Sequence, residues 1–329
     1  MNDDTLDSSA QANGGITPPW AGLRVAVIVP CYNEEIAIPK VIADFRAALP
    51  DATIYVYDNN SRDRTMEVAR AAGAVVRCER LQGTGQVVRR MFADIEADAY
   101  VLVDGDDTYD AAASPEMLRL LVEEQLDMVN GARTTAIEAA YRRGHRFGNA
   151  LLTGMVANVF GSRITDMLSG YRVFSRRFVK SFPALASGFE TETEFTVHAL
   201  ELRMPLAEVS IAYKDRPAGS VSKLRTYTDG FRILRMIIIL VKEERPLQFF
   251  TLLAAILMIF GIGLGIPVVL EFLRTGLVPR LPSAVLATGF VLLSFLSLTC
   301  GLILDSVSRQ RREMKRLAYL SIPAVASKP

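Results

Sequence analysis

Apolar and polar positions follow two different rhythms along the N-terminal part of the chain. Short apolar or β-branched runs are typical of strands, while apolar residues that recur every three or four positions are typical of helices. The two kinds of segment follow one another as strand, helix, strand, helix, strand and strand, over Val25 to Val29, Ile36 to Leu49, Thr53 to Tyr57, Thr65 to Ala72, Val75 to Val76 and Tyr100 to Val103. This order predicts an α/β domain with a mainly parallel sheet covered by helices.

The pattern changes in the C-terminal part. Two uncharged apolar stretches, 247–270 and 283–304, are each long enough at about 1.5 Å per residue to cross a hydrocarbon core of roughly 30 Å. They predict two transmembrane helices, with a buried helix pair of a soluble protein as the alternative. Residues 224–246 show an amphipathic helical pattern with a basic stripe. Such a helix lies in the membrane interface or packs on the domain or a neighbouring subunit.

Charge gives the chain an expected orientation. With 37 Lys and Arg against 36 Asp and Glu, the net charge is +1, which does not favour a nucleic-acid partner. Basic residues flank the two spans at Lys242, Arg245 and Arg309 to Arg316, against Arg274 and Arg280 in the connecting loop. Positive residues favour the cytoplasmic side of a membrane. We therefore expect a multi-pass protein of the inner (cytoplasmic) membrane whose N-terminal domain is cytoplasmic.

The expected organisation has five parts: a disordered tail 1–22, an α/β domain 23–223, an amphipathic juxtamembrane helix 224–246, a transmembrane hairpin 247–305 and a basic cytoplasmic tail 306–329. The N-terminal tail is polar and has no apolar signal-peptide core. Cys31, Cys78 and Cys300 lack metal-ligand spacing and fit a reducing compartment. Small residues in the first span, Gly261, Gly263 and Gly265, permit close helix contact and so a homo-oligomer.

Acidic residues end the apolar run that begins at Tyr100. Asp104 and Asp106 are separated by one residue and are followed by Asp107. In open α/β sheets ligands bind at the carboxyl ends of strands, and Mg²⁺ is held by one or two carboxylates together with substrate phosphates. This suggests a metal-bound phosphorylated substrate, with Mg²⁺ or Mn²⁺ as the ion. A plain acidic turn is the alternative.

Polar segments also end the first two predicted strands, at Pro30 to Glu35 and at Asp58 to Asp63. They place further polar groups at the same sheet edge as Asp104. Asp63 alone has a simpler interpretation as the cap of the helix that begins near Thr65.

The densest basic cluster of the domain contains Arg142, Arg143 and Arg146. Arginine is the favoured side chain for phosphate because its planar fork bonds two oxygens at once. The cluster predicts a cradle for an acceptor phosphate, with a solvated basic surface as the alternative. Arg133 and Arg172 are the second choice for the same role.

Taken together, these segments resemble the family 2 GT-A glycosyltransferases, in particular the polyprenyl-phosphate (dolichyl-phosphate) sugar synthases. The resemblance covers about Leu23 to Lys223 and extends to the two spans. Three later segments carry it further, namely Thr165 to Phe174, Gly188 to Glu192 and Arg216 to Lys223. It implies a GT-A (Rossmann-like) fold, followed by an interfacial helix and a membrane hairpin.

The resemblance also implies roles for individual residues. Asp104 and Asp106 would bind the metal and act in catalysis together with Arg216 and Lys223. Ser169 and Arg172 fall in the segment placed near the acceptor phosphate. The nucleotide site would contain Pro30, Tyr32, Asn33, Glu34, Asp58, Asn60, Asp63, Gly83 and Gly85.

Two positions depart from the family pattern. The loop Gly83 to Gly85 lacks the lysine that is often found there, so any phosphate contact from it would come from the backbone. Thr108 stands where a glutamine commonly follows the metal acids. Asp107 beside it is either a third metal ligand or a solvated neighbour.

The function that the resemblance implies is inverting transfer of one sugar from a nucleotide donor, with UDP favoured, to polyprenyl phosphate such as undecaprenyl phosphate. A flippase and a downstream glycosyltransferase of a cell-envelope glycan are the further partners it implies. A processive polysaccharide synthase of the same fold is the first alternative, but its Gln-x-x-Arg-Trp element is missing, since the only tryptophan is Trp20. A non-catalytic partner of a sugar flippase is the second.

Overall fold

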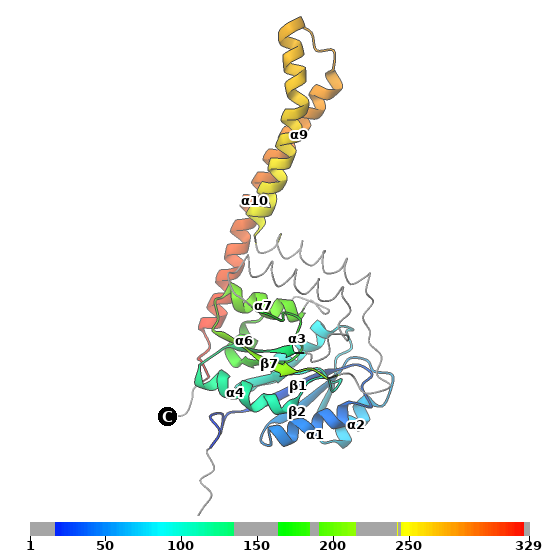
Figure 1. Ribbon diagram of the computed structural model, residues 1–329, viewed down its shortest axis with the longest axis vertical. Helices are drawn as coiled ribbons and strands as arrows, with labels where there is room; N and C mark the ends of the chain where they lie inside the picture. Colours follow the sequence, from blue (N-terminus) through cyan, green and yellow to red (C-terminus); the bar gives the residue numbers. More distant parts are fainter. Residues whose placement is uncertain (1–16, 135–163, 185–190, 215–241, 243–244, 326–329) are drawn as a thin grey trace, which may run out of the picture.

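The computed structural model describes residues 17–134, 164–184, 191–214, 242 and 245–325. An α/β domain carries two long helices that project away from it (Figure 1). Nearly all of the predicted amphipathic segment 224–246 lies outside the described residues. The elements are β1 (Val25–Cys31), α1 (Ile38–Ala48), β2 (Thr53–Asp58), α2 (Thr65–Ala71), β3 (Val75–Cys78), α3 (Thr84–Asp94), β4 (Ala99–Leu102), the 3₁₀ turn η1 (Ala111–Ala113), α4 (Ser114–Glu123), β5 (Met128–Thr134), β6 (Arg172–Ser175), α6 (Arg176–Ser181), α7 (Thr191–Glu201), β7 (Leu206–Ala212), α9 (Pro246–Thr275) and α10 (Leu281–Leu320).

The strands form a seven-stranded sheet in the order β3-β2-β1-β4-β6-β5-β7. β1 is parallel to β2 and β4, β2 is parallel to β3, and β5 is parallel to β7. β6 runs antiparallel to both of its neighbours, β4 and β5. The predicted mainly parallel sheet is confirmed, and the first four predicted elements match β1, α1, β2 and α2.

Helices cover both faces of the sheet because successive strand side chains point to opposite sides. In β1, Val25, Val27 and Val29 join one buried cluster, while Ala26 and Ile28 join the other. The first cluster contains the buried faces of α1, α2 and α4, and the second contains those of α3, α6 and α7. Figure 1 shows the same two layers on either side of the strands. Burial on both faces explains why β1 and β4 are almost continuously apolar.

The strand directions decide where the site can form. The carboxyl ends of β1, β2, β4, β5 and β7 lie at one edge of the sheet, together with the start of antiparallel β6. The polar segments that follow these strands therefore converge at this edge, as the sequence predicts. We call it the acid edge, after Asp104 and Asp106.

The two projecting helices pack against each other with small residues at a seven-residue spacing. The buried positions include Ala254, Gly261 and Val268 in α9, and Ala287, Ser294, Gly301 and Ser308 in α10. A seven-residue repeat is typical of two helices that coil around each other. The Ser294 hydroxyl donates a hydrogen bond of 2.8 Å to the Ala254 carbonyl. Gly261, which the sequence analysis assigned to oligomer contacts, is therefore used inside the hairpin.

Both helices are long and apolar enough to cross a membrane. Their outward-facing apolar side chains, such as Ile259 and Phe295, are more than half exposed, whereas a core helix of a soluble protein would bury them. α10 also continues as a helix beyond Leu304 to Leu320. Residues 306–320, which were predicted as part of a basic tail, thus continue the helix that contains the second span.

His198 is a buried histidine in α7, 1% exposed. Its Nε2 lies 3.1 Å from the Ser181 hydroxyl, which is itself 3.1 Å from the Phe178 carbonyl. Nδ1 has no hydrogen-bond partner among the described residues. Burial, with a smaller contribution from Lys315, lowers the pKa of His198 to about 3.

Substituting leucine at Gly261 should destabilise the hairpin. A β-carbon there would lie 2.8 Å from Val291 Cγ2 and 3.2 Å from the Ala287 carbonyl oxygen, whereas one at Gly263 meets no described atom within 4 Å. We expect Gly261→Leu to cost about 1 to 3 kcal/mol and Gly263→Leu to have little effect. Thermal unfolding in detergent measures both variants. Equal melting temperatures would contradict the packing described here.

The buried histidine predicts a loss of stability in acid. Its folded pKa lies below the unfolded value of about 6.5, so its contribution is fully present above pH 6.5 and is lost as the pH falls towards 3. Between pH 8 and pH 5 the expected loss is about 2 kcal/mol. Thermal unfolding of the wild type and of His198→Gln at both pH values isolates this contribution. The prediction fails if the two proteins lose the same stability on acidification.

Candidate active site

Hydrogen bonds tie the loop after β1 to the loop after β2. The Asn33 amide donates to the Ser61 hydroxyl at 2.8 Å, and the Asn33 side-chain oxygen accepts from the Arg62 amide at 2.8 Å. The Glu34 amide donates to the Thr65 hydroxyl at 2.9 Å. Asn33 has a φ of 55°, a left-handed conformation that asparagine adopts more readily than most residues. The two predicted nucleotide-binding segments therefore form one unit.

Asp63 stabilises these two loops through hydrogen bonds. One carboxylate oxygen accepts the amide and hydroxyl hydrogens of Thr65, and the other accepts the Glu35 amide at 3.1 Å. Of the two interpretations of Asp63, the structure supports the local one at the start of α2. We therefore regard its contribution to a nucleotide site as indirect.

Asp58, at the end of β2, is the buried acid of this region, 2% exposed. Its Oδ2 accepts the Ser61 amide at 3.0 Å. Its Oδ1 is buried and has no hydrogen-bond partner in the part of the chain that the structure describes. A buried carboxylate oxygen without a donor is costly, so this atom is suited to accept a hydrogen bond from a bound ligand.

Asn59 connects the same strand end to the loop that contains Gly83. Its side-chain nitrogen donates to the carbonyls of Glu79 at 3.0 Å and Leu81 at 2.7 Å. Its side-chain oxygen accepts the Gly83 amide at 2.7 Å. The predicted glycine loop thus reaches the acid edge through Asn59, a residue that the sequence analysis left out. The signal in the sequence that could have identified Asn59 is the run of polar residues Asp58, Asn59 and Asn60 at the end of β2.

Asp104 and Asp106 follow β4 at the centre of the acid edge. Asp106 is 4% exposed, and its Oδ1 accepts the Thr108 hydroxyl at 2.6 Å and the Thr108 amide at 3.3 Å. A β-carbon at Gly170 would lie 2.3 Å from Asp104 Oδ2, so the carboxylate occupies the space where a side chain would stand. Gly170 and Thr108 therefore fix the orientation of the two acids.

Asp107 turns away from this pair. Its backbone has a φ of 57°, and its carboxylate lies 2.9 Å from the Lys40 ammonium of α1. This ion pair supports the interpretation of Asp107 as a neighbour of the metal acids. In the described ranges no three His, Cys, Asp or Glu side chains gather into a complete metal cage. Two carboxylates suit Mg²⁺ or Mn²⁺ when substrate phosphates complete the coordination.

Glu192 and Tyr109 lie in the electrostatic field of Asp104. Burial, together with the negative charge of Asp104, raises the pKa of Glu192 to about 8. Burial and the same charge also raise the pKa of Tyr109. The Tyr109 hydroxyl accepts the Gly170 amide at 2.9 Å. Neither residue was among the predicted site residues, although Glu192 ends one of the quoted segments.

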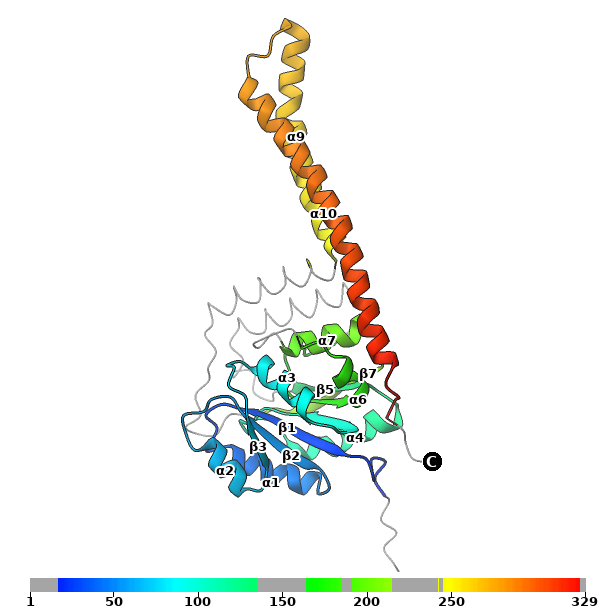
Figure 2. The same cartoon turned by 180° about the vertical axis from the view of Figure 1, so that it is seen from behind.

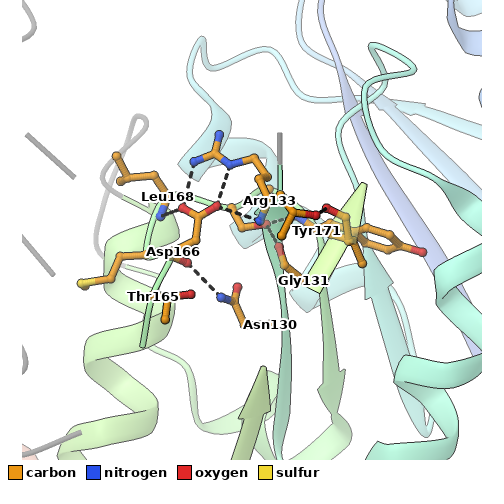
Figure 3. A network of polar contacts seen from close by, with 12 residues as sticks. Asn130, Gly131, Arg133, Thr165, Asp166, Leu168 and Tyr171 are labelled. Carbon is orange, nitrogen blue, oxygen red and sulfur yellow. Dashed lines mark hydrogen bonds and ion pairs between the residues drawn. The ribbon is translucent and has the colours of Figure 1, made fainter. Parts of the chain in front are cut away.

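Arg133, one of the predicted phosphate ligands, lies at the end of β5 and pairs with Asp166. Its Nε lies 2.6 Å from Asp166 Oδ2, and a terminal nitrogen lies 2.9 Å from Oδ1 (Figure 3). The Asp166 backbone carbonyl accepts from Asn130 at 2.9 Å. The Arg133 guanidinium also lies 5.5 Å from the centre of the Tyr213 ring. The pair brings the Arg133 guanidinium to the acid edge with its charge balanced by Asp166.

The structure gives Arg172 and Ser169 a structural role. Arg172 is 0% exposed and donates to the carbonyls of Ser169 at 3.1 Å and Met167 at 2.7 Å and to the Thr196 hydroxyl at 2.9 Å. The buried Ser169 hydroxyl donates to the Gly131 carbonyl at 2.5 Å. A phosphate ligand needs an accessible donor, so we leave both residues out of the acceptor site.

The other predicted basic residues lie outside the described residues. These are Arg142, Arg143, Arg146, Arg216 and Lys223. Their assignments to the acceptor phosphate and to the donor diphosphate stay predictions. Pro30, Tyr32, Asn60 and Gly85 all lie in the segments that surround the acid edge.

Comparisons with known proteins place these features in a wider context. The family model of glycosyl transferase family 2 matches residues 26–182, from β1 to α6. The glycosyltransferase AglJ of Haloferax volcanii is 31% identical over 298 residues, which cover 90% of this chain and 98% of the relative. The dolichyl-phosphate hexose transferase of the same organism is 30% identical over 221 residues, which cover 67% and 95%.

A solved structure shares the fold. Glucosyl-3-phosphoglycerate synthase from Mycobacterium tuberculosis, in complex with Mn²⁺ and UDP-glucose, superimposes with a TM-score of 0.54 at 22% identity. The match covers 68% of this chain and 80% of that protein. At this identity the likeness concerns the fold of the α/β domain.

Adding a methyl group at Gly170 should weaken metal binding. Because the new β-carbon would lie 2.3 Å from Asp104 Oδ2, the carboxylate must move. We expect Gly170→Ala to reduce Mn²⁺ affinity by about tenfold or more, as when the support of a metal ligand is lost. Calorimetry with Mn²⁺ in the presence of a nucleoside diphosphate measures the change.

Gly131→Ala is the matched control. Its β-carbon would meet the end of the Ile211 side chain at 2.5 Å, so it disturbs packing in β5 without touching an acid. If both variants bind Mn²⁺ as the wild type does, Gly170 does not set the position of Asp104.

Proposed function

The chain belongs to glycosyl transferase family 2, its α/β domain is of the GT-A type, and from that premise we propose that it transfers a single sugar from a nucleotide donor to a polyprenyl phosphate. We favour a UDP-sugar as the donor, undecaprenyl phosphate as the acceptor and inversion at the anomeric carbon. The reaction would take place at the cytoplasmic face of the inner membrane and feed a cell-envelope glycan. A flippase and a downstream glycosyltransferase would then handle the product.

The observation that carries this proposal is the presence of two features in one chain. A carboxylate pair, Asp104 and Asp106, stands at a sheet edge suited to a water-soluble nucleotide. The same chain continues into α9 and α10, which are apolar enough to lie in a membrane. A transferase with a soluble donor and a lipid acceptor needs both features. The dolichyl-phosphate hexose transferase of Haloferax volcanii, by its name, acts on such a lipid.

The donor would lie along the loops that follow β1, β2 and β3. The Oδ1 of Asp58, which has no partner among the described residues, would accept an N–H of the nucleobase. The bonded loops of Asn33, Ser61 and Arg62 would form the adjoining wall. The Gly83 loop offers backbone groups at the same edge. The diphosphate would then extend towards Asp104 and Asp106.

Negative charge builds on the diphosphate as it leaves the sugar. Asp104 and Asp106 would hold a divalent ion, which would supply positive charge at that point. The Thr108 hydroxyl, which donates to Asp106, keeps that carboxylate oriented. Arg216 and Lys223 are proposed to contact the same diphosphate. Preorganised charges of this kind contribute because they do not reorganise during the reaction.

The acceptor would react without a general base. A phosphate monoester has a second pKa of about 6, so it is mostly dianionic at neutral pH and is already a nucleophile. A direct attack on the anomeric carbon inverts its configuration. We propose that Arg142, Arg143 and Arg146 hold this phosphate. Arg133 supports them from the described part of the site, where Asp166 fixes its guanidinium group.

A panel of labelled nucleotide sugars tests the proposed function. Purified protein in vesicles that contain undecaprenyl phosphate should move label from one of them into the organic phase. The transfer should stop when EDTA removes the metal. Asp106→Asn should lower the turnover by at least about 10²-fold, because it removes a charge that positions the metal.

Asp107→Asn is the control for this substitution. Asp107→Asn makes the same chemical change one residue further on, but this carboxylate pairs with Lys40. Because the Lys40 side chain is 54% exposed, water screens the pair, and it contributes about 1 kcal/mol. We expect a change of a few fold. Label that enters only a water-soluble product, or full activity in EDTA, would refute the proposed reaction.

A further inference from the structure

The end of α10 lies outside any membrane and against the α/β domain. At 40 residues, the helix is about 60 Å long, whereas about 20 residues suffice to cross a bilayer. Figures 1 and 2 both show its last turns beside α6 and α7. Two buried acids of the domain, Asp127 and Glu201, meet it there.

Asp127 is the first of these acids. Its side chain is completely buried and accepts the Ser175 hydroxyl at 2.7 Å and forms an ion pair with Arg177. Its other oxygen accepts the hydroxyl of Tyr319, from α10, at 2.8 Å. The Arg177 guanidinium lies 4.9 Å from the centre of the Tyr319 ring. Tyr319 thus provides the hydrogen bond to the second oxygen of a buried carboxylate.

Glu201, at the end of α7, is the second acid, with a side chain that is 3% exposed. The Lys315 ammonium lies 2.7 Å from one of its oxygens, and Arg312 Nε lies 3.8 Å from the other. Arg312, Lys315 and Tyr319 are three and four residues apart, so they share one face of α10. Removing a partner from a buried charge is costly, so this face binds the domain firmly.

This contact lies far from the chemistry. In the β4–β6 pair, Ser175 stands opposite Ala99 at the start of β4, and Arg172 stands opposite Leu102 at its end, next to the acids. Ser175 and Asp127 therefore lie at the opposite ends of the strands from the acid edge. A contact there does not touch the substrates, and it acts on them only through the placement of the whole domain.

We propose that the end of α10 is a strut that sets the height and tilt of the catalytic domain relative to the membrane, with Tyr319 and Lys315 as its positioning residues. Tyr319 lies 15 residues after Leu304, or about 22 Å further along the helix. A lipid phosphate is confined to the plane of the headgroups, whereas a soluble donor is not. The position of the acid edge above that plane therefore matters for the lipid acceptor alone. This inference rests on the proposed function.

The test compares two acceptors with one pair of substitutions. Tyr319→Phe removes the hydroxyl but keeps the ring over Arg177, and Lys315→Met removes the charge but keeps the stem. We expect the double variant to lose at least tenfold in kcat/KM for undecaprenyl phosphate in vesicles, mainly through KM. With a short, water-soluble prenyl phosphate it should stay within twofold of the wild type. The control is Arg309→Met, since Arg309 is exposed and pairs with Asp305 of the same helix.

A second measurement is independent of catalysis. Cys78 is exposed on the domain and takes a fluorescent donor in a Cys300→Ser background, while the vesicle headgroups carry the acceptor dye. Energy transfer then reports the distance between the domain and the membrane surface. We expect the double variant to change the transfer efficiency and the Arg309 variant to leave it unchanged.

Each outcome decides the proposal. Equal losses with both acceptors would mean that the contact only stabilises the fold, and unchanged kinetics would mean that it has no role in the reaction. Either result, or unchanged energy transfer, overturns the strut. If the wild type glycosylates neither acceptor, the proposed function fails, and energy transfer still shows whether the end of α10 sets the position of the domain.

Discussion

The placement of two carboxylates at the end of β4 is the constraint on which the candidate site depends. Asp106 is buried and Asp104 is partly buried, and burial together with the charge of Asp104 raises the pKa of Glu192 to about 8. Antiparallel β6 brings Gly170 to Asp104, and the missing side chain leaves room for the carboxylate. An arrangement that concentrates negative charge in this way is suited to a cation.

The sequence predicted the elements whose burial is regular. β1, α1, β2 and α2 follow from apolar runs and helical periodicity, and the acids at the end of β4 follow from the abrupt change after Val103. It could not predict the role of Arg172, because a charged residue is expected at the surface and only the fold supplies the carbonyls that surround it. The sequence also left two roles open for Asp107, a third metal ligand or a solvated neighbour. The contact that distinguishes them is with Lys40, which lies on another element.

For the C-terminal helices, too, the sequence predicts the elements but not their contacts. Length and composition identified both apolar stretches, yet the sequence assigned Gly261 to contacts between chains, and the structure uses it against Val291 and Ala287. The basic run after Leu304 has the composition of a charged tail, and the sequence does not show which acids its charges meet. Placed on a helix, Arg312 and Lys315 share a face, and that face meets Glu201. Periodicity shows which residues share a face, but the contact depends on an acid more than a hundred residues away in the chain.

Asn59 fixes the backbone of the loop at 79–83, and this determines which positions of the loop can vary. Its side chain holds the carbonyls of Glu79 and Leu81 and the amide of Gly83, and all three are backbone groups. Asn60 donates to the Arg80 carbonyl at 2.8 Å, which is again a backbone group. The Arg80 side chain takes part in none of these contacts, whereas Gln82 also bonds the side chains of Asn59 and Asn60. Arg80 can therefore be substituted while these hydrogen bonds keep the course of the loop. A change at this position alters the charge that the loop displays while its backbone stays tied to β2.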